Sequence, residues 1–217
     1  MGQLRAAVIP VTPFQQNCTI LWDEASGDGV VIDPGGEVDR IMAAVQRAGA
    51  MIERIWLTHG HLDHAGGAAE LRDALNGVPI EGPERHDEFL LQNLEEQGRA
   101  CGFEMRNVMP DRWLAEGDRL TFGGHSFDVH HCPGHTPGHV VFVNRVAQLA
   151  VVGDVLFQGS VGRTDFPYGD HAALIRAITE KLLPLGDDVQ FLCGHGPGST
   201  IGAERRTNPF LRRTGHE

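Results

Sequence analysis

Short apolar runs separated by proline, asparagine and glycine recur along the chain, and this pattern predicts strands. The runs occupy residues 8–9, 19–22, 30–32, 55–57, 120–122, 126–130, 140–143, 149–152 and 189–192. Apolar positions at helical spacing predict helices over about 37–48, 65–75, 83–99 and 172–183. The third helix should carry Phe89, Leu90 and Leu94 on one side. Strands mixed with helices throughout indicate two sheets covered by outer helices, a layered α/β arrangement.

Size and charge exclude several function classes. A chain of 217 residues can build one good-sized core, so we predict a single domain over residues 1–217. No apolar run reaches about 18 residues, so no membrane span is expected. The formal net charge of -11 argues against nucleic acid as a partner. The N-terminus has no signal-peptide pattern and the four cysteines include no CxxC pair, so we expect reduced thiols and a cytoplasmic location.

The segment LTHGHLDHAGG, residues 57–67, concentrates potential metal ligands. His59, His61, Asp63 and His64 fall within six consecutive positions, among glycines that let the backbone bend and approach closely. A divalent metal needs several nitrogen or oxygen ligands at about 2.0–2.2 Å, and a tight loop can supply them. One ion can rarely use all four donors of so short a segment. Two adjacent metals are therefore the natural interpretation, and a solvated polar loop is the alternative.

Further donors occur in three distant segments. His135 follows the predicted strand 126–130, Asp154 follows the strand 149–152, and His195 follows the last predicted strand. Each lies beside glycine at the end of an apolar strand, as His59 does. Loops at strand ends are where a rigid scaffold assembles a site.

Two other histidines are weaker candidates. His131 adjoins another histidine and can face either side of its strand. His139 is expected to be structural or to support the ligands rather than to bind metal. Neither is included in the predicted site.

In their order along the chain these motifs resemble the metallo-β-lactamase superfamily. The resemblance covers nearly the whole chain and is carried by VIDPGG with Asp33, THGHLDH, CPGHTPGH, GD at 153–154 and CGHGP at 193–197. It implies a four-layer αββα sandwich of the α/β (α+β) class, in which Asp33 shapes the loops of the site. It also implies three histidines for one metal, an aspartate and two histidines for a second, and one aspartate bridging both. In that order the ligands are His59, His61 and His135; Asp63, His64 and His195; and Asp154.

The implied cofactor is a pair of divalent metal ions. Zinc is the first choice, and iron or manganese would accept the same donors. Five neutral imidazoles, two carboxylates and a bridging hydroxide leave such a pair with a net charge of about +1. Bound water would ionise near neutral pH, and the metals would polarise a substrate carbonyl. We therefore predict an acyl hydrolase in which Asp63 and Asp154 are catalytic as well as ligating.

Within the superfamily, the chain is most similar to short bacterial members of the glyoxalase II branch, the hydroxyacylglutathione hydrolases. The similarity lies in GDVLFQGSVGRTDFPYGD at 153–170 and ERRTNPFL at 204–211. It implies hydrolysis of S-D-lactoylglutathione to D-lactate and glutathione by a metal-bridging hydroxide. Antibiotic-hydrolysing zinc enzymes often have cysteine at the position of Asp154, which disfavours a β-lactamase, and the lack of a large insertion disfavours the RNA-processing branch.

The longer glyoxalase II enzymes add a helical C-terminal domain with glutathione contacts, which we expect this chain to lack. In the loop that corresponds to the one containing Arg163, those enzymes also carry a basic residue that contacts a carboxylate of glutathione. We therefore predict that Arg163 binds substrate; the alternative is an arginine that is solvated or paired within the protein. A basic tail, Arg205, Arg206, Arg212 and Arg213, is expected to be solvated or structural rather than to cover the rim of the site.

Two alternative functions stay open. GRTDF also resembles persulfide dioxygenases, which hold a single iron with two histidines and one aspartate. The motifs alone do not decide how many metals are retained. A metal-binding protein on a catalytically dead hydrolase scaffold is the non-enzymatic alternative. Metal content and assays on S-lactoylglutathione and glutathione persulfide separate the three.

Overall fold

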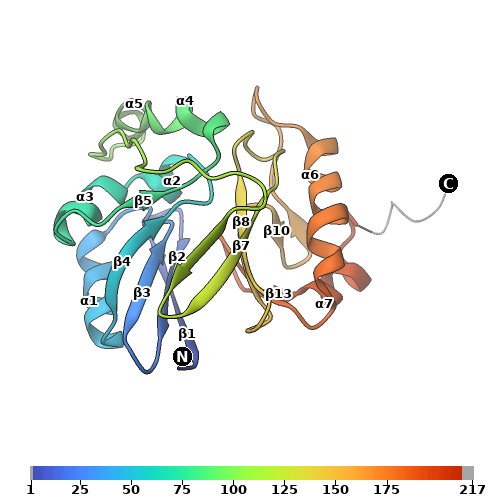
Figure 1. Cartoon of the computed structure of the whole chain (residues 1–217). Coiled ribbons are helices and arrows are strands. Elements are labelled where there is room, and N and C mark those ends of the chain that lie inside the picture. The colour runs from blue at the N-terminus through green and yellow to red at the C-terminus, as the bar shows by residue number, and fades with distance from the viewer. Residues whose placement is uncertain (1, 212–217) are drawn as a thin grey trace.

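Two sheets pack against each other at the centre of the computed structural model, which describes residues 2–211 (Figure 1). One sheet has five strands in the order β1-β2-β3-β4-β5, and the other has six in the order β13-β12-β9-β8-β7-β6. The first comprises β1 (Leu4–Val11), β2 (Gln16–Asp23), β3 (Asp28–Ile32), β4 (Met51–Trp56) and β5 (Ile80–Glu81). The second comprises β6 (Arg119–Phe122), β7 (His125–His131), β8 (Val140–Asn144), β9 (Leu149–Gly153), β12 (Gln190–Cys193) and β13 (Ser199–Thr200). A separate hairpin is formed by β10 (Leu156–Phe157) and β11 (Ser160–Val161).

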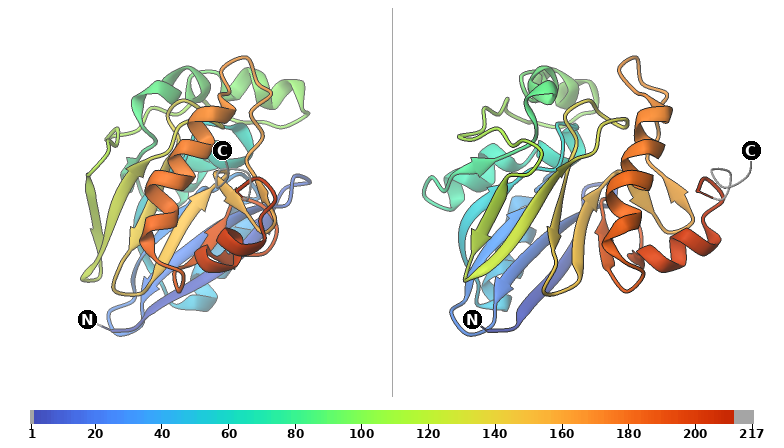
Figure 2. Two further views of the ribbon diagram at one scale, coloured as in Figure 1. Left: turned by 90° about the vertical axis from the view of Figure 1, so that its right-hand side faces the viewer. Right: turned by 45° about the vertical axis from the view of Figure 1, so that its right-hand side comes forward.

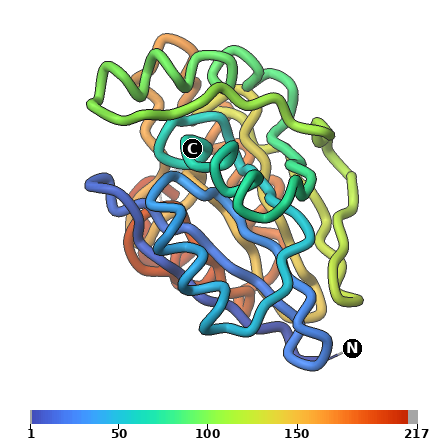
Figure 3. The backbone as a smooth tube through the Cα atoms, turned by 90° about the vertical axis from the view of Figure 1, so that its left-hand side faces the viewer, coloured from blue at the N-terminus to red at the C-terminus, as the bar shows by residue number. Residues whose placement is uncertain are grey.

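Helices cover the outer face of each sheet. The five-stranded side carries α1 (Val38–Ala48), α2 (Leu62–Ala65), α3 (Ala68–Ala74), α4 (Glu88–Leu91) and α5 (Leu94–Ala100). The six-stranded side carries α6 (His171–Ala177), which continues as turns over Ile178–Leu182 and Leu183–Leu185, and α7 (Ile201–Thr207). Figure 2 shows α6 and α7 outside the second sheet, and Figure 3 shows α1 and α3 on the opposite side. The predicted αββα sandwich is confirmed.

The core consists of three apolar layers. Between the sheets, the ring of Trp56 lies 5.3 Å from that of Phe142 and 5.4 Å from that of Phe127. Residues of α1, including Ile41, pack with Val31 and other side chains on the outer face of the first sheet, and α6 packs similarly on the second. Central strands are covered on both faces, which explains why they read as continuous apolar runs rather than as alternating patterns.

The helix predicted over 83–99 is wrong as a single element. It divides into a short 3₁₀ turn at Arg85–Asp87, then α4 and α5, with a break at Asn93. Leu90 and Leu94 are buried as predicted, whereas Phe89 is 47% exposed. At the break, the amide of Val108 donates to the carbonyl of Leu91 at 3.1 Å, and Asn107 Oδ1 accepts the amide of Glu95 at 2.9 Å, so a later loop bonds to both helix ends.

The helix predicted over 65–75 is also interrupted. It begins earlier, at Leu62, and stops at Gly66 before resuming at Ala68. The amide of Gly67 donates to the carbonyl of Pro34 at 2.8 Å, and a Cβ on Gly67 would lie 2.7 Å from that oxygen. The close approach of the two loops therefore requires glycine there.

The basic residues near the C-terminus are partly described. Arg205 donates to Asp187 at 2.8 Å, and Arg206 lies 3.6 Å from the same carboxylate. These contacts fit the structural alternative for that part of the tail, whereas Arg212 and Arg213 lie outside the described residues. Of the helices in the described part of the chain, none has the length and apolar character needed to cross a bilayer.

Candidate metal centre

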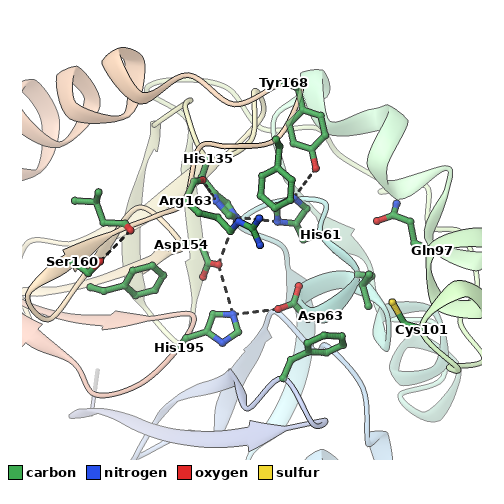
Figure 4. Close-up of a pocket in the computed structure, with 15 residues that line it drawn as sticks. His61, Asp63, Gln97, Cys101, His135, Asp154, Ser160, Arg163, Tyr168 and His195 are labelled. Carbon is green, nitrogen blue, oxygen red and sulfur yellow. Dashed lines mark hydrogen bonds and ion pairs between the residues drawn. The ribbon is translucent and has the colours of Figure 1, made fainter. Parts of the chain in front are cut away.

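Strand register brings the predicted ligands to one edge of the sandwich. Strand β12 runs parallel to β9 with Cys193 opposite Gly153, so His195 and Asp154 leave the sheet side by side. Strand β4 runs parallel to β3, so the loop after Trp56 emerges beside Asp33. The loop after β7 joins them across the sandwich. Figure 4 shows the members of the cluster that line a cavity, namely His61, Asp63, His135, Asp154 and His195.

Three histidines form one compact group, called here the three-histidine group. His61 Nδ1 lies 3.1 Å from His59 Nε2 and 2.9 Å from His135 Nε2. These atoms all lie within 4.8 Å of one another, as one metal ion would require. His59 and His135 are buried. His61 and His135 come from different loops and are 74 residues apart along the chain.

Asp63, His64 and His195 form a second cluster, called here the mixed group. His195 Nε2 lies 3.2 Å from Asp63 Oδ2, and His64 Nε2 lies 3.9 Å from the same oxygen. Asp154 stands between the two groups. Its Oδ1 is 3.4 Å from His64 Nε2, and its Oδ2 is 3.5 Å from His135 Nε2. One carboxylate therefore reaches donors of both groups.

The outer partners of the histidines decide which ring nitrogen carries the proton. Thr58 Oγ1 donates its only proton to the Asp33 carboxylate at 2.6 Å, so it must accept from His59 Nδ1 at 3.0 Å. His135 Nδ1 donates to a backbone carbonyl at 2.8 Å, and His64 Nδ1 donates to Asp33 at 2.9 Å. The rings of His59 and His135 therefore hold an unprotonated Nε2 toward the cluster, the form that binds metal. His64 uses its Nδ1 on Asp33, so Nε2 is the nitrogen that faces the cluster.

The ionisation of the three-histidine group agrees with that assignment. Burial lowers the pKa of His59 and of His135, and lowers that of His61 to about 3, so the three-histidine group is neutral at pH 7. Burial opposes protonation of His64 too, but the carboxylates of Asp154 and Asp63 together raise its pKa. The pKa of Asp154 is well below its ordinary value despite burial, chiefly because His64 is close.

A divalent cation would satisfy this set of side chains. Without one, the lone pairs of His59 Nε2 and His135 Nε2 both face His61 Nδ1, which can donate at most one proton between them. Asp154 Oδ1 and His64 Nε2 are buried, and neither has a hydrogen-bond partner among the described residues. Buried polar atoms are normally paired, so such atoms converging on one point indicate a missing positive ion. Imidazole and carboxylate ligands suit zinc and iron alike.

The two weaker histidines lie outside both groups. His139 Nε2 accepts the backbone N–H of Asp154 at 3.0 Å, and its ring stacks on His59 at 4.5 Å. It therefore supports two candidate ligands from behind, as expected. His131 donates to the carbonyl of Pro137 at 2.8 Å and is not part of the cluster.

Two residues near the site escaped the sequence analysis. Tyr168 places its hydroxyl 2.9 Å from His61 Nε2, the nitrogen that faces away from the other two histidines. Asp87 is fully buried and hydrogen-bonds both ligand loops. Burial raises the pKa of Asp87 to about 6, against the effect of those hydrogen bonds. Asp87 lies on the polar side of the helix predicted over 83–99, so its local sequence does not distinguish it from a solvent-exposed carboxylate.

The cavity above the cluster holds about 570 Å³ and is largely apolar. Its wall includes Phe14, Leu62, Gln97, Cys101, Phe157, Ser160, Val161, Arg163, Phe166 and Tyr168. Arg163 lies 4.5 Å over the ring of Phe166 and forms a two-pronged ion pair with Asp165 at 2.7 and 2.8 Å. Arg163 therefore lines the cavity and is also paired within the protein, whereas its contact with substrate stays a prediction.

A family model for the metallo-β-lactamase superfamily matches residues 11–195. The chain belongs to this superfamily. Among curated relatives, the hydroxyacylglutathione hydrolase GloC of Haemophilus influenzae is 47% identical over 206 residues, covering 94% of this chain and 96% of that protein. The chain is accordingly a metallo-hydrolase.

Two solved structures of the superfamily are similar over almost their full length. TTHA1623 in a di-iron-bound form is 40% identical with a TM-score of 0.84, covering 94% of this chain and all of that one. The BLEG-1 B3 metallo-β-lactamase is 35% identical with a TM-score of 0.87, covering 95% of this chain and 99% of that one. The fold is common to a protein in a di-iron-bound form and to an enzyme named as a β-lactamase, so substrate and metal must be argued from the site.

Proposed function

We propose that this protein hydrolyses a glutathione thioester, S-D-lactoylglutathione, to D-lactate and glutathione, as a single cytoplasmic domain spanning residues 1–217. The observation that carries the proposal is the position of Asp154, whose carboxylate lies within 3.6 Å of nitrogens from both histidine clusters at the floor of the cavity. The relative named hydroxyacylglutathione hydrolase supports the choice of thioester. The four cysteines are free thiols, which suits a reducing compartment.

The proposed site binds two divalent ions, with zinc as the first choice and iron or manganese as alternatives. The three-histidine group would hold one ion, the mixed group the other, and Asp154 would contact both. Bound ions would lower the pKa of a water molecule and polarise the thioester carbonyl. A thiolate is a good leaving group, so the reaction needs no dedicated general acid.

The chain's own residues orient the substrate. Asp63 and Asp154 present carboxylates to the cavity, and both are proposed as catalytic because they border the reacting carbonyl. Asp165 occupies Nε and Nη2 of Arg163, which leaves Nη1 for a carboxylate of glutathione. Phe14 and Phe157 line the cavity and exclude water from part of it.

The deciding experiment measures metal content and three activities on one preparation. The proposal predicts two ions per chain and cleavage of S-D-lactoylglutathione by the fully loaded protein. A single iron with oxygen uptake on glutathione persulfide would replace it with the dioxygenase function. Cleavage of a chromogenic cephalosporin in preference to the thioester would support the activity named for the B3 enzyme. A fully loaded protein inert toward all three would support the non-catalytic metal-binding protein.

A further inference from the structure

Asp87 joins two loops that come from different sheets. It closes the short turn Arg85–Asp87 and is fully buried. Its Oδ2 accepts the backbone N–H of Gly60 at 2.8 Å and the hydroxyl of Thr136 at 2.7 Å. Its Oδ1 accepts the backbone N–H of Gly138 at 2.6 Å. Three donors from two loops are therefore held by one carboxylate.

The two loops are those that carry the three-histidine group. Gly60 lies between His59 and His61, and Thr136 directly follows His135. No hydrogen bond of Asp87 in the described chain reaches a member of the mixed group. Asp33 instead accepts from His64 directly, and it reaches His59 only through Thr58. The hydrogen bonds of Asp87 therefore lie directly beside members of the three-histidine group, whereas Asp63 and His64 lie further along the first loop.

The packing around Asp87 leaves little room for the loops to shift. A Cβ added to Gly60 would lie 2.8 Å from Leu90 Cβ, and one added to Gly138 would lie 2.6 Å from the backbone nitrogen of Asp87. A buried carboxylate is unfavourable unless hydrogen bonds compensate for its lost hydration. Any movement that separates the loops breaks these bonds, so the carboxylate and its donors fix one another's positions.

We propose that Asp87 is a positioning residue that sets the geometry of the three-histidine group and thereby the affinity of one metal ion. The inference rests on the two-metal site proposed above. It extends that site to a residue that touches neither substrate nor metal. Partners that orient metal ligands typically change metal affinity by about 10- to 100-fold when they are replaced.

The test compares stepwise Zn²⁺ affinities of metal-stripped variants, measured by competition with a chromophoric chelator. His135→Ala and His195→Ala identify which binding step belongs to which group. Asp87→Asn should weaken the step that His135→Ala affects by about 10- to 100-fold and leave the other step nearly unchanged. Asp23→Asn is the matched control. Asp23 is a buried carboxylate with its own backbone donors, Ala25 and Ser26, at the far end of β2, and its replacement should change neither step.

Thr136→Val provides a second variant that keeps Asp87 and removes a single hydroxyl donor. It should weaken the same step by a smaller factor, so the inference stays testable even where Asp87→Asn does not fold. Equal weakening of both steps, or of the His195 step alone, would overturn the inference. Unchanged affinities in a folded variant would do the same.

Failure of the two-metal proposal has a different signature. A wild-type protein that takes up only one Zn²⁺ ion would contradict that proposal before any variant is measured. The role of Asp87 would then be judged on the affinity for that single ion. Weaker Zn²⁺ binding in both Asp87→Asn and His135→Ala would support the positioning role of Asp87. Weaker Zn²⁺ binding in His195→Ala alone would overturn it.

Discussion

At the scale of single residues, Asp154 has the most consequential position because one side chain serves both clusters. Asp154→Ala removes the only carboxylate within 3.6 Å of both groups in the described chain. We expect metal content to fall below one ion per chain and kcat/KM to fall by more than about 100-fold, beyond what loss of an indirect partner produces. Metal analysis and thioester kinetics check this prediction. Near-normal metal content in the variant would show that the carboxylate is not a ligand.

Replacements of His139 and His131 should reduce metal affinity less than Asp154→Ala does, and to different extents. His139→Ala removes the acceptor of the Asp154 N–H, so metal affinity should fall by about 10-fold or more. His131→Ala removes contacts to the carbonyl of Pro137 and to Glu84, neither of which belongs to the two groups, and it should bind metal almost normally. A variant at His131 that lost metal while His135→Ala kept it would reverse the assignment of ligands in this segment.

Arg163 and Asp165 form an ion pair, and replacing one or the other should change KM in opposite directions. Arg163→Ala removes a charged contact and should raise KM by roughly 10- to 100-fold with a smaller effect on kcat. Asp165→Asn removes the internal carboxylate that occupies two guanidinium nitrogens, and it should lower KM for a substrate with a free carboxylate. Steady-state kinetics of both variants with S-D-lactoylglutathione check the pair. An increase in KM from both replacements would indicate that the ion pair is purely structural.

A pH dependence of stability follows from Asp23. Hydrogen bonds from Ser26, and to a smaller extent from His125 and Ala25, lower its pKa from 3.8 to about 2. Because the folded pKa lies below the unfolded one, its stabilising effect is complete above about pH 5 and is lost as the pH falls from about 4 toward 2. Denaturant unfolding of metal-free protein should therefore show a difference in the free energy of unfolding between wild type and Asp23→Asn, and this difference should shrink as the pH falls over that range. A difference independent of pH would contradict the prediction.

At the scale of elements, the structure separates what a local pattern can predict from what it cannot. The strands are buried on both faces and therefore appear in the sequence as apolar runs, and the ligands follow them beside glycine. The helix break at Gly67 involves the loop of Pro34, and the break at Asn93 involves the loop of Asn107 and Val108, so helical periodicity alone did not reveal them. The roles of Asp87 and Tyr168 likewise arise from tertiary contacts, which a sequence without alignment does not report.

Helix α7 offers a prediction at this scale, because it holds the hairpin β10–β11 that walls the cavity. Glu204 accepts the amide of Gly159 at 2.7 Å, and Asn208 donates to the carbonyl of Ser160 at 3.0 Å. Both residues belong to the segment ERRTNPFL. Asn208→Ala should loosen the wall that carries Phe157 and raise KM by about 2- to 10-fold, the range for one lost hydrogen bond, with two metal ions still bound. Loss of metal in this variant would contradict a role confined to the cavity wall.

At the scale of the whole molecule, the metal centre connects the two halves of the sandwich. The loop after β4, which carries His59 to His64, comes from the five-stranded sheet. His135, Asp154 and His195 follow β7, β9 and β12 of the six-stranded sheet. Each proposed metal position takes donors from both sheets. Ions bound there would therefore resist separation of the sheets as well as support catalysis.

Removal of metal should consequently lower thermal stability in a measurable way. An ion present at about 1,000 times its dissociation constant stabilises the folded state by about 4 kcal/mol. For a domain of this size that corresponds to a shift in Tm of roughly 8–16 °C per ion. Differential scanning calorimetry with and without a chelator should show a decrease of at least that size in wild type. Asp154→Ala should show little change, since it would already have lost most of its metal. A wild-type Tm that stays constant while the ions are removed would mean that the two sheets hold together without help from the site.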